Sequence, residues 1–170
     1  MRIFINPGHK IGEDPGACGF GLQEAQVAFN ISKRVEFFLN DINYTTKIFA
    51  FDGLEEIVDV ANYWNPDLFV SIHCNAFDSF ARGTETYYGD SIDSYNAAAA
   101  IHNQILNRLP TIDRGIKSGS HLFVLNHTLC PAVLVETAFI DNPADSKLLI
   151  ERQEDFARAI ACGITDALAN

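Results

Sequence analysis

Three side chains that can bind a metal or move a proton stand at the ends of apolar runs of strand length. His9 ends the run INPGH, His73 ends VSIH and Glu136 ends AVLVE. The carboxyl ends of neighbouring parallel strands meet at one edge of a sheet, which is where open α/β sheets bind ligands. We therefore expect His9, His73 and Glu136 to lie together at that edge.

A fourth candidate, Glu24, follows from the apolar stripe of a helix predicted over residues 22–40. The stripe has helical spacing and consists of Ala28, Ile31, Val35, Phe38 and Leu39. Extended back by four residues, it begins at Glu24. A carboxylate on a buried face is costly unless a cation neutralises it, so Glu24 is predicted to have a cationic partner. The alternative is that Glu24 only complements the dipole of the helix N-terminus.

Two imidazoles and one carboxylate form a typical ligand set of catalytic zinc, which takes three protein ligands and keeps one position open for water. We assign His9, Glu24 and His73 as the ligands of one Zn²⁺ per chain. The metal would lower the pKa of the bound water and polarise a carbonyl group. Glu136 is then the candidate catalytic residue, a general base that takes the proton of that water and passes it to a leaving nitrogen.

Each of these residues also has a simpler interpretation. His73 could be a hydrogen-bonded core histidine, His9 a turn residue after Asn-Pro-Gly, and Glu136 a strand end in solvent. Because these residues and Glu24 all fall at one predicted sheet edge, a shared chemical role is favoured over four unrelated structural roles.

The remaining histidines fit the site less well. His102 lies in the middle of a predicted helix, and His121 begins a predicted strand at the wrong end of the sheet. His127 follows that strand, so it could bind substrate, although a surface-loop position is favoured.

The hydrophobic periodicity predicts strands that alternate with helices. Strands are expected at residues 2–6, 44–51, 67–73, 84–88, 121–125 and 132–136, and helices at 22–40, 54–64, 92–109, 144–150 and 153–168. This alternation predicts a layered α/β domain with a largely parallel sheet of six strands.

The composition is that of one globular domain, with 170 residues of which 48% are hydrophobic and 20% charged. The net charge of -10 disfavours nucleic-acid binding and means that an anionic substrate must be held by local contacts. The four cysteines are not spaced as a disulfide framework, so we expect free thiols. We expect no membrane span.

The first residues, MRIFIN, already have the pattern of a strand, so no signal peptide is expected. We therefore expect export by another route, release by a phage, or a place within a longer protein.

The chain resembles the zinc-dependent N-acetylmuramoyl-L-alanine amidases of type 3, which are cell-wall hydrolases of bacteria and of phage lysins. The resemblance runs from about residue 2 to 168 and rests on the ordered strings INPGH, DPGACGFGLQEAQ, DLFVSIHCNAF, GTETYY, DRGIK, LFVL and CPAVLVETAFIDNPADSKLL. It implies a three-layer α/β sandwich with helices on both faces of a six-stranded, mostly parallel (mixed) sheet. It also implies that residues 1–170 are a single catalytic domain, with His9, Glu24 and His73 as zinc ligands and Glu136 as the catalytic glutamate.

The chain departs from the family pattern close to these motifs. Lys10 and Ile11 stand where glycines usually follow the first histidine. Lys47 and Ile57 stand where the family usually has arginines, and Ala138 replaces the glycine of Glu-Thr-Gly-Phe. None of these positions is a predicted ligand, so we expect them to affect the surrounding loops and the range of substrates.

The resemblance implies hydrolysis of the amide between N-acetylmuramic acid and L-alanine of the stem peptide, with peptidoglycan as the partner and the cell wall as the place of action. The alternatives are a zinc exopeptidase or another zinc amidohydrolase acting on peptides, and an inactive wall-binding module. By position only, Asn75, Phe77, Arg114 and His127 are expected to line the substrate groove.

Overall fold

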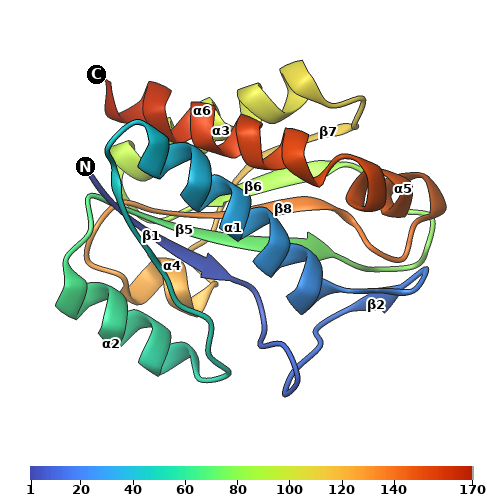
Figure 1. The fold of residues 1–170 in the computed structure, drawn as a ribbon, viewed down its shortest axis with the longest axis horizontal. Helices are drawn as coiled ribbons and strands as arrows, with labels where there is room; N and C mark the ends of the chain where they lie inside the picture. Colours follow the sequence, from blue (N-terminus) through green and yellow to red (C-terminus); the bar gives the residue numbers. More distant parts are fainter. Residues whose placement is uncertain (170) are drawn as a thin grey trace.

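A six-stranded sheet forms the centre of the computed structural model, which describes residues 1–169 (Figure 1). Its spatial order is β4-β1-β5-β8-β6-β7. The strands are β1 (Arg2–Pro7), β4 (Thr45–Ile48), β5 (Leu68–Asn75), β6 (Thr84–Tyr88), β7 (Asp113–Ser118) and β8 (Ala132–Phe139). A separate small hairpin pairs β2 (Cys18–Gly19) with β3 (Leu22–Gln23).

The sheet is mixed. Neighbouring strands pair in parallel except for β6 and β8, which pair antiparallel, so β6 and β7 run opposite to the other four strands. The predicted six-stranded, mostly parallel sheet is therefore confirmed.

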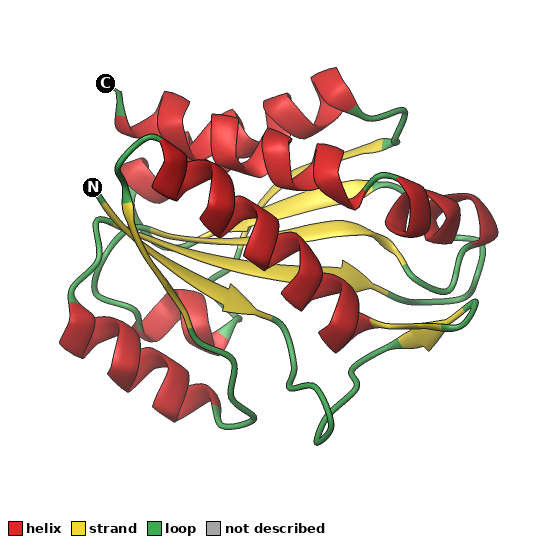
Figure 2. Cartoon of the chain, viewed as in Figure 1, coloured by secondary structure: helices red, strands yellow, loops and turns green. Residues whose placement is uncertain are grey.

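Helices cover both faces of the sheet, which gives three layers (Figure 2). One face carries α1 (Glu24–Asp41), α3 (Ile92–Arg108), α5 (Pro143–Glu151) and α6 (Gln153–Leu168). The other carries the shorter α2 (Leu54–Trp64) and α4 (Phe123–His127). The predicted α/β three-layer sandwich is confirmed.

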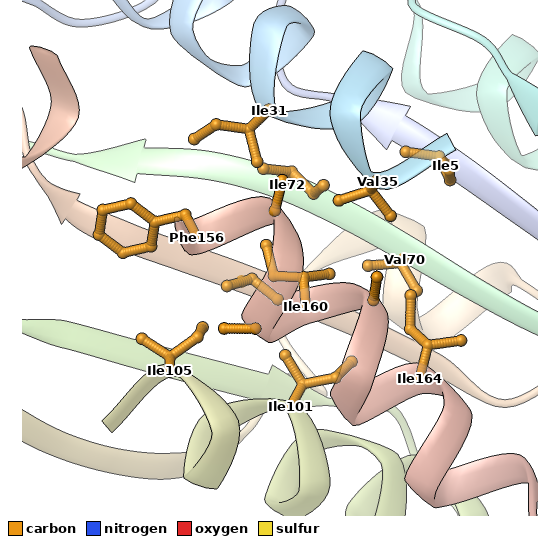
Figure 3. Close-up of a cluster of buried hydrophobic side chains, with 14 of the residues drawn as sticks. Ile5, Ile31, Val35, Val70, Ile72, Ile101, Ile105, Phe156, Ile160 and Ile164 are labelled. Carbon is orange, nitrogen blue, oxygen red and sulfur yellow. The ribbon is translucent and has the colours of Figure 1, made fainter. Parts of the chain in front are cut away.

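Two apolar clusters hold the layers together, because successive side chains of a strand point to opposite faces. On the first face, Ile5 and Ile72 of the sheet pack against Ile31, Ile101 and Ile160 of the helices (Figure 3). On the second face, Phe4 and Phe69 pack with residues of α2 and α4 such as Ile57 and Val124. The clusters fix β1 and β5 side by side and so determine where their carboxyl ends lie.

Helices α3 and α6 approach each other closely at Gly163. A Cβ atom at this position would lie 2.3 Å from the Cα atom of Ile101. Only a residue without a side chain fits there, so the glycine sets the spacing of the two helices.

The strand predicted at residues 121–125 is wrong. The segment forms helix α4, in which Val124 and Leu125 are buried against the second face. A short apolar run does not distinguish a buried helix from a strand. The sixth strand is instead β7, a half-exposed edge strand whose residues, DRGIKS, lack an apolar pattern.

Two smaller expectations concern cysteines and membranes. The cysteines among the described residues are all free thiols, as expected. Within residues 1–169, every helix is too short or too polar to cross a membrane.

Candidate metal centre

His9 lies two residues beyond the end of β1 in a left-handed backbone conformation, with φ of 63°. Its Nδ1 atom is 2.6 Å from Oδ2 of Asp14, whose other oxygen accepts a hydrogen bond from the backbone nitrogen of Gly16. Asp14 therefore fixes the imidazole so that Nε2 points towards Glu24, at 3.1 Å from Oε2.

Gly8 allows this histidine to lie against the next strand. A Cβ atom on Gly8 would come within 2.4 Å of the His73 imidazole. The two imidazoles can therefore approach to 5.5 Å between ring centroids because the residue before His9 has no side chain.

Glu24 is the first residue of α1, and only 3% of it is exposed. Its Oε1 atom lies 2.9 Å from Nδ1 of His73 and accepts a hydrogen bond from the backbone nitrogen of Cys74. Its Oε2 atom accepts a hydrogen bond from the backbone nitrogen of Ala17. These contacts, together with His9, use both carboxylate oxygens.

The electrostatics of the site follow from these contacts. Burial alone would raise the pKa of Glu24, but the hydrogen bonds from His73 and His9 outweigh it and hold the pKa well below its usual range. The hydrogen bond to Glu24 in turn raises the pKa of His9 to about 9. The buried carboxylate is thus an anion that faces two imidazoles. Each imidazole can carry a positive charge itself or bind a metal cation.

His9, Glu24 and His73 each offer one ligand atom, and these atoms lie within 4.8 Å of one another. The structure brings the three predicted ligands together although they come from the loop after β1, from α1 and from β5. This cluster could bind a metal ion, and its two nitrogens and one oxygen match the ligand preference of zinc.

Glu136 lies on β8 directly opposite His73 on β5. Its Oε2 atom is buried and makes no hydrogen bond to any residue in the described part of the chain. Burial raises the pKa of Glu136 to about 7. A carboxyl group with a pKa near neutral can both accept and return a proton, which is what a general base and acid must do.

The comparison with known proteins adds to this geometry. The chain matches the family of N-acetylmuramoyl-L-alanine amidases over residues 3–169. It belongs to that family.

One relative of this amidase-family protein comes from a bacterium. It is 40% identical to the N-acetylmuramoyl-L-alanine amidase LytC of Bacillus subtilis (strain 168) over 86% of this chain and 31% of LytC. It therefore spans about a third of the length of that relative.

Two solved structures resemble it over nearly their full length. N-acetylmuramoyl-L-alanine amidase AmiC2 of Nostoc punctiforme has a TM-score of 0.93 and 34% identity, over 100% of this chain and 98% of that one. The catalytic domain of CwlV from Bacillus (Paenibacillus) polymyxa var. colistinus has a TM-score of 0.89 and 31% identity, over 99% and 98%.

A cavity of about 360 Å³ opens beside the two histidines of this amidase fold. Its walls come from the loops after β1 and β4 and from the α2 and α4 segments. They include Phe51, Leu54, Ile57, Leu122, Phe123 and Val124. Ile57, which stands where the family usually has an arginine, is thus an apolar wall residue here.

The residues predicted to line a substrate groove lie in different places. Asn75 and Arg114 both contact Glu85 on the face of the sheet that carries Glu136, through hydrogen bonds of 2.9 and 2.8 Å. Phe77 lies on the loop after β5 with 81% of its surface exposed.

His127 does not lie where the sequence suggested. It ends helix α4 rather than following a strand, its Nδ1 lies 3.0 Å from the carbonyl oxygen of Phe123, and it is not among the residues that line the cavity. His127 therefore does not line the cavity beside His9 and His73, and its contact with substrate stays a prediction.

Asp14 and Glu85 contact residues of the site but were not predicted from the sequence. Asp14 belongs to the glycine-rich loop and Glu85 to the string GTETYY, so each lies in a motif that resembles the amidase family. Neither residue stands at a strand end or on a helical stripe, and the chemical pattern gave no signal for them.

Proposed function

We propose that this chain hydrolyses the amide bond between N-acetylmuramic acid and L-alanine of the peptidoglycan stem peptide. The observation that carries the proposal is the cluster of His9, Glu24 and His73 beside Glu136, in a chain of this amidase family. Residues 1–170 act as a single catalytic domain, and the place of action is the cell wall.

One Zn²⁺ held by His9, Glu24 and His73 fits the residues present. Glu24 is a buried anion that faces two imidazole nitrogens, and Asp14 orients His9 as carboxylates commonly orient ligand histidines. When bound, zinc supplies a Lewis acid that activates water and polarises the scissile carbonyl.

Glu136 supplies the proton transfer. Its carboxylate, whose Oε2 has no hydrogen-bond partner among the described residues, takes a proton from the attacking water. Because burial keeps its pKa near neutral, Glu136 can then return the proton to the alanine nitrogen as the amide bond breaks. His9, Glu24 and His73 keep their places throughout.

Digestion of purified peptidoglycan tests the proposal. We expect new peptides with L-alanine at the free amino end, intact glycan strands, and loss of activity with a zinc chelator that zinc restores. Metal analysis of the active protein should give one zinc per chain. Glycan cleavage, or unchanged release of peptides after complete metal removal, would overturn the proposal.

The same digestion separates the alternative functions. A zinc exopeptidase would release single amino acids or shortened stems while the bond to muramic acid stays intact. An inactive wall-binding module would sediment with the walls and release nothing. The buried, unpaired oxygen of Glu136 supports an enzyme over that module, because a polar atom left unpaired destabilises the fold and a binding surface has no use for it.

A further inference from the structure

Glu136 has charged neighbours on both sides along one face of the sheet. On one side is His73 of β5, and on the other is Glu85 of β6, directly opposite Glu136 in the antiparallel pair. Beyond Glu85 lies the edge strand β7, which provides Arg114 and Lys117. Two carboxylates opposite each other repel, so Glu85 needs its own cations.

Glu85 is almost fully buried, with 3% exposed, and both of its oxygens are hydrogen-bonded. Oε2 accepts from Nε of Arg114 at 2.8 Å and from Nζ of Lys117 at 2.6 Å. Oε1 accepts from the side chains of Asn75 and Tyr87, each at 2.9 Å. The carboxylate thus holds the two cations in fixed places.

The two cations exceed what Glu85 requires. Counted over these three side chains alone, one carboxylate against an arginine and a lysine leaves a net charge of +1, in a chain whose net charge is -10. Their side chains are 34% and 40% exposed, so the surplus charge faces solvent beside Glu136. Within residues 1–169, Arg114 donates a side-chain hydrogen bond only through Nε, so its two terminal nitrogens can still bind an anion.

We propose that Arg114 and Lys117 bind a carboxylate of the stem peptide and that Glu85 positions them. This inference rests on the proposed amide hydrolysis and adds the orientation in which the substrate binds. Arginine and lysine with unused N–H groups recognise carboxylates through charge-assisted hydrogen bonds. The acidic surface elsewhere would repel such a substrate, so a local cationic pair is what brings it in.

The position of Glu136 determines which end of the substrate lies beside Arg114 and Lys117. Glu136 must return a proton to the leaving nitrogen, so the leaving peptide continues from Glu136 away from His73, over β6 and β7. The muramoyl group then lies towards the cavity beside His9 and His73.

The distances agree with this direction. Neighbouring strands lie about 4.8 Å apart, so β7 is about 10 Å from β8. An extended peptide advances about 3.5 Å per residue. The side chains of Arg114 and Lys117 reach back over β6 to Glu85, which lies about one strand spacing from Glu136. The residue that follows L-alanine is therefore the one whose carboxylate they meet.

The test uses two synthetic peptides with L-alanine at the amino end that differ only in a free carboxylate or a carboxamide on the next residue. Titration calorimetry with the zinc-loaded protein should show that the carboxylate form binds at least about tenfold more tightly. Arg114→Met and Lys117→Met should each remove most of this preference while carboxamide binding stays within about twofold. Each variant keeps one cation for Glu85, and thermal unfolding checks that it is folded.

Arg158→Met is the matched control. Arg158 pairs with Glu154 on α6, on the opposite face of the sheet, and its loss should leave the preference unchanged. Equal binding of the two peptides to the wild-type protein would overturn the proposal. Equal weakening of both peptides in the Arg114 and Lys117 variants would also overturn it, because that is the result of a purely structural role.

The failure of this inference and that of the proposed function give different results. Selective binding of the carboxylate peptide without release of peptide from walls would support the carboxylate subsite and overturn the proposed amide hydrolysis. Release of peptide from walls without any preference for the carboxylate would support the amide hydrolysis and overturn the carboxylate subsite. If the peptides bind too weakly for calorimetry, the ratio of kcat/KM for the two corresponding muramoyl peptides gives the same comparison.

Discussion

Glu24 shows how a single residue organises the candidate metal centre. Its two oxygens face His9 on one side and His73 on the other, and both also accept backbone hydrogen bonds. The helix stripe that placed Glu24 on a buried face predicted a cationic partner, and the structure provides two imidazoles. The three donor groups are therefore held together before any metal arrives.

Glu136→Gln removes the proton acceptor while the shape of the side chain stays nearly the same. We expect peptidoglycan hydrolysis to fall by about 10²–10⁴-fold, the usual range for general acid–base catalysis. Zinc content should be unchanged, because Glu136 is not one of the three clustered donors. Turnover close to that of the wild type would show that another group moves the proton.

Asp14→Asn removes the carboxylate that orients His9. Because the contact to Nδ1 is the one that leaves Nε2 facing Glu24, zinc affinity should fall by about 10–100-fold. Competition with a chromophoric chelator measures this affinity. His127→Ala is the control, since His127 is exposed on α4 and outside the cavity. The zinc affinity of this variant should match that of the wild type.

At the scale of elements, the strands and helices that form the core are those predicted from hydrophobic periodicity. The structure differs from the prediction at β7 and α4. Residues 121–125 were apolar enough to resemble a strand, yet they bury Val124 and Leu125 as a helix. Strand β7 has little apolar character because an edge strand is half exposed, so its sequence does not reveal it.

The contact between α3 and α6 gives a prediction for Gly163. A side chain at this position would overlap the backbone of Ile101, so Gly163→Val should destabilise the protein by about 1–3 kcal/mol, the usual cost of overpacking. Denaturant unfolding measures the change. Arg158→Ala, on the exposed side of the same helix, should alter the free energy of unfolding by less than about 0.5 kcal/mol.

The Glu85 network links β5, β6 and β7, and it predicts how stability depends on pH. Burial alone would raise the pKa of Glu85, but hydrogen bonds from Lys117, Arg114 and Tyr87 lower it below the usual 4.5. Its stabilising contribution is therefore complete above the unfolded pKa of 4.5 and is lost as the pH falls through the lower folded value.

Comparison with Glu85→Gln isolates this contribution. The variant should be less stable than the wild type by about 1–3 kcal/mol near neutral pH, because two cations lose their anion. The difference should shrink as the pH is lowered from about 7 to about 3. A difference that stays constant over this range would mean that the charge of Glu85 is not what stabilises the strands.

At the scale of the whole molecule, the candidate metal centre joins segments that are distant in the sequence. The three candidate ligand groups, at positions 9, 24 and 73, come from the loop after β1, from α1 and from β5. A metal bound there connects the sheet to a helix of the first face. Because such a metal binds the folded state and not the unfolded chain, it stabilises the whole domain.

Metal removal should therefore lower the unfolding temperature without changing the fold. With zinc at about 100 times its dissociation constant, the stabilisation is about 2.7 kcal/mol. Calorimetric unfolding with and without chelator measures the shift, and the far-ultraviolet circular dichroism should be the same in both states. His73→Ala should unfold at the same temperature with and without zinc, since it lacks one of the three donors.

The sequence by itself determined the layers and the four residues at the centre. Its apolar periods are local properties, so they identify the buried faces of strands and helices and show that Glu24 lies on one of them. Charged or metal-binding side chains at those faces stand out because burial without a partner is costly.

Only the tertiary structure decided which of these groups are neighbours. Strand β8 lies between β5 and β6, which places Glu136 between His73 and Glu85, and no local pattern contains that order. Asp14 beside His9, and Arg114 with Lys117 around Glu85, likewise depend on loops and an edge strand that carry no periodic signal. Sheet order is a property of long-range packing, because the side chains that meet across strands are separated by tens of residues in the chain.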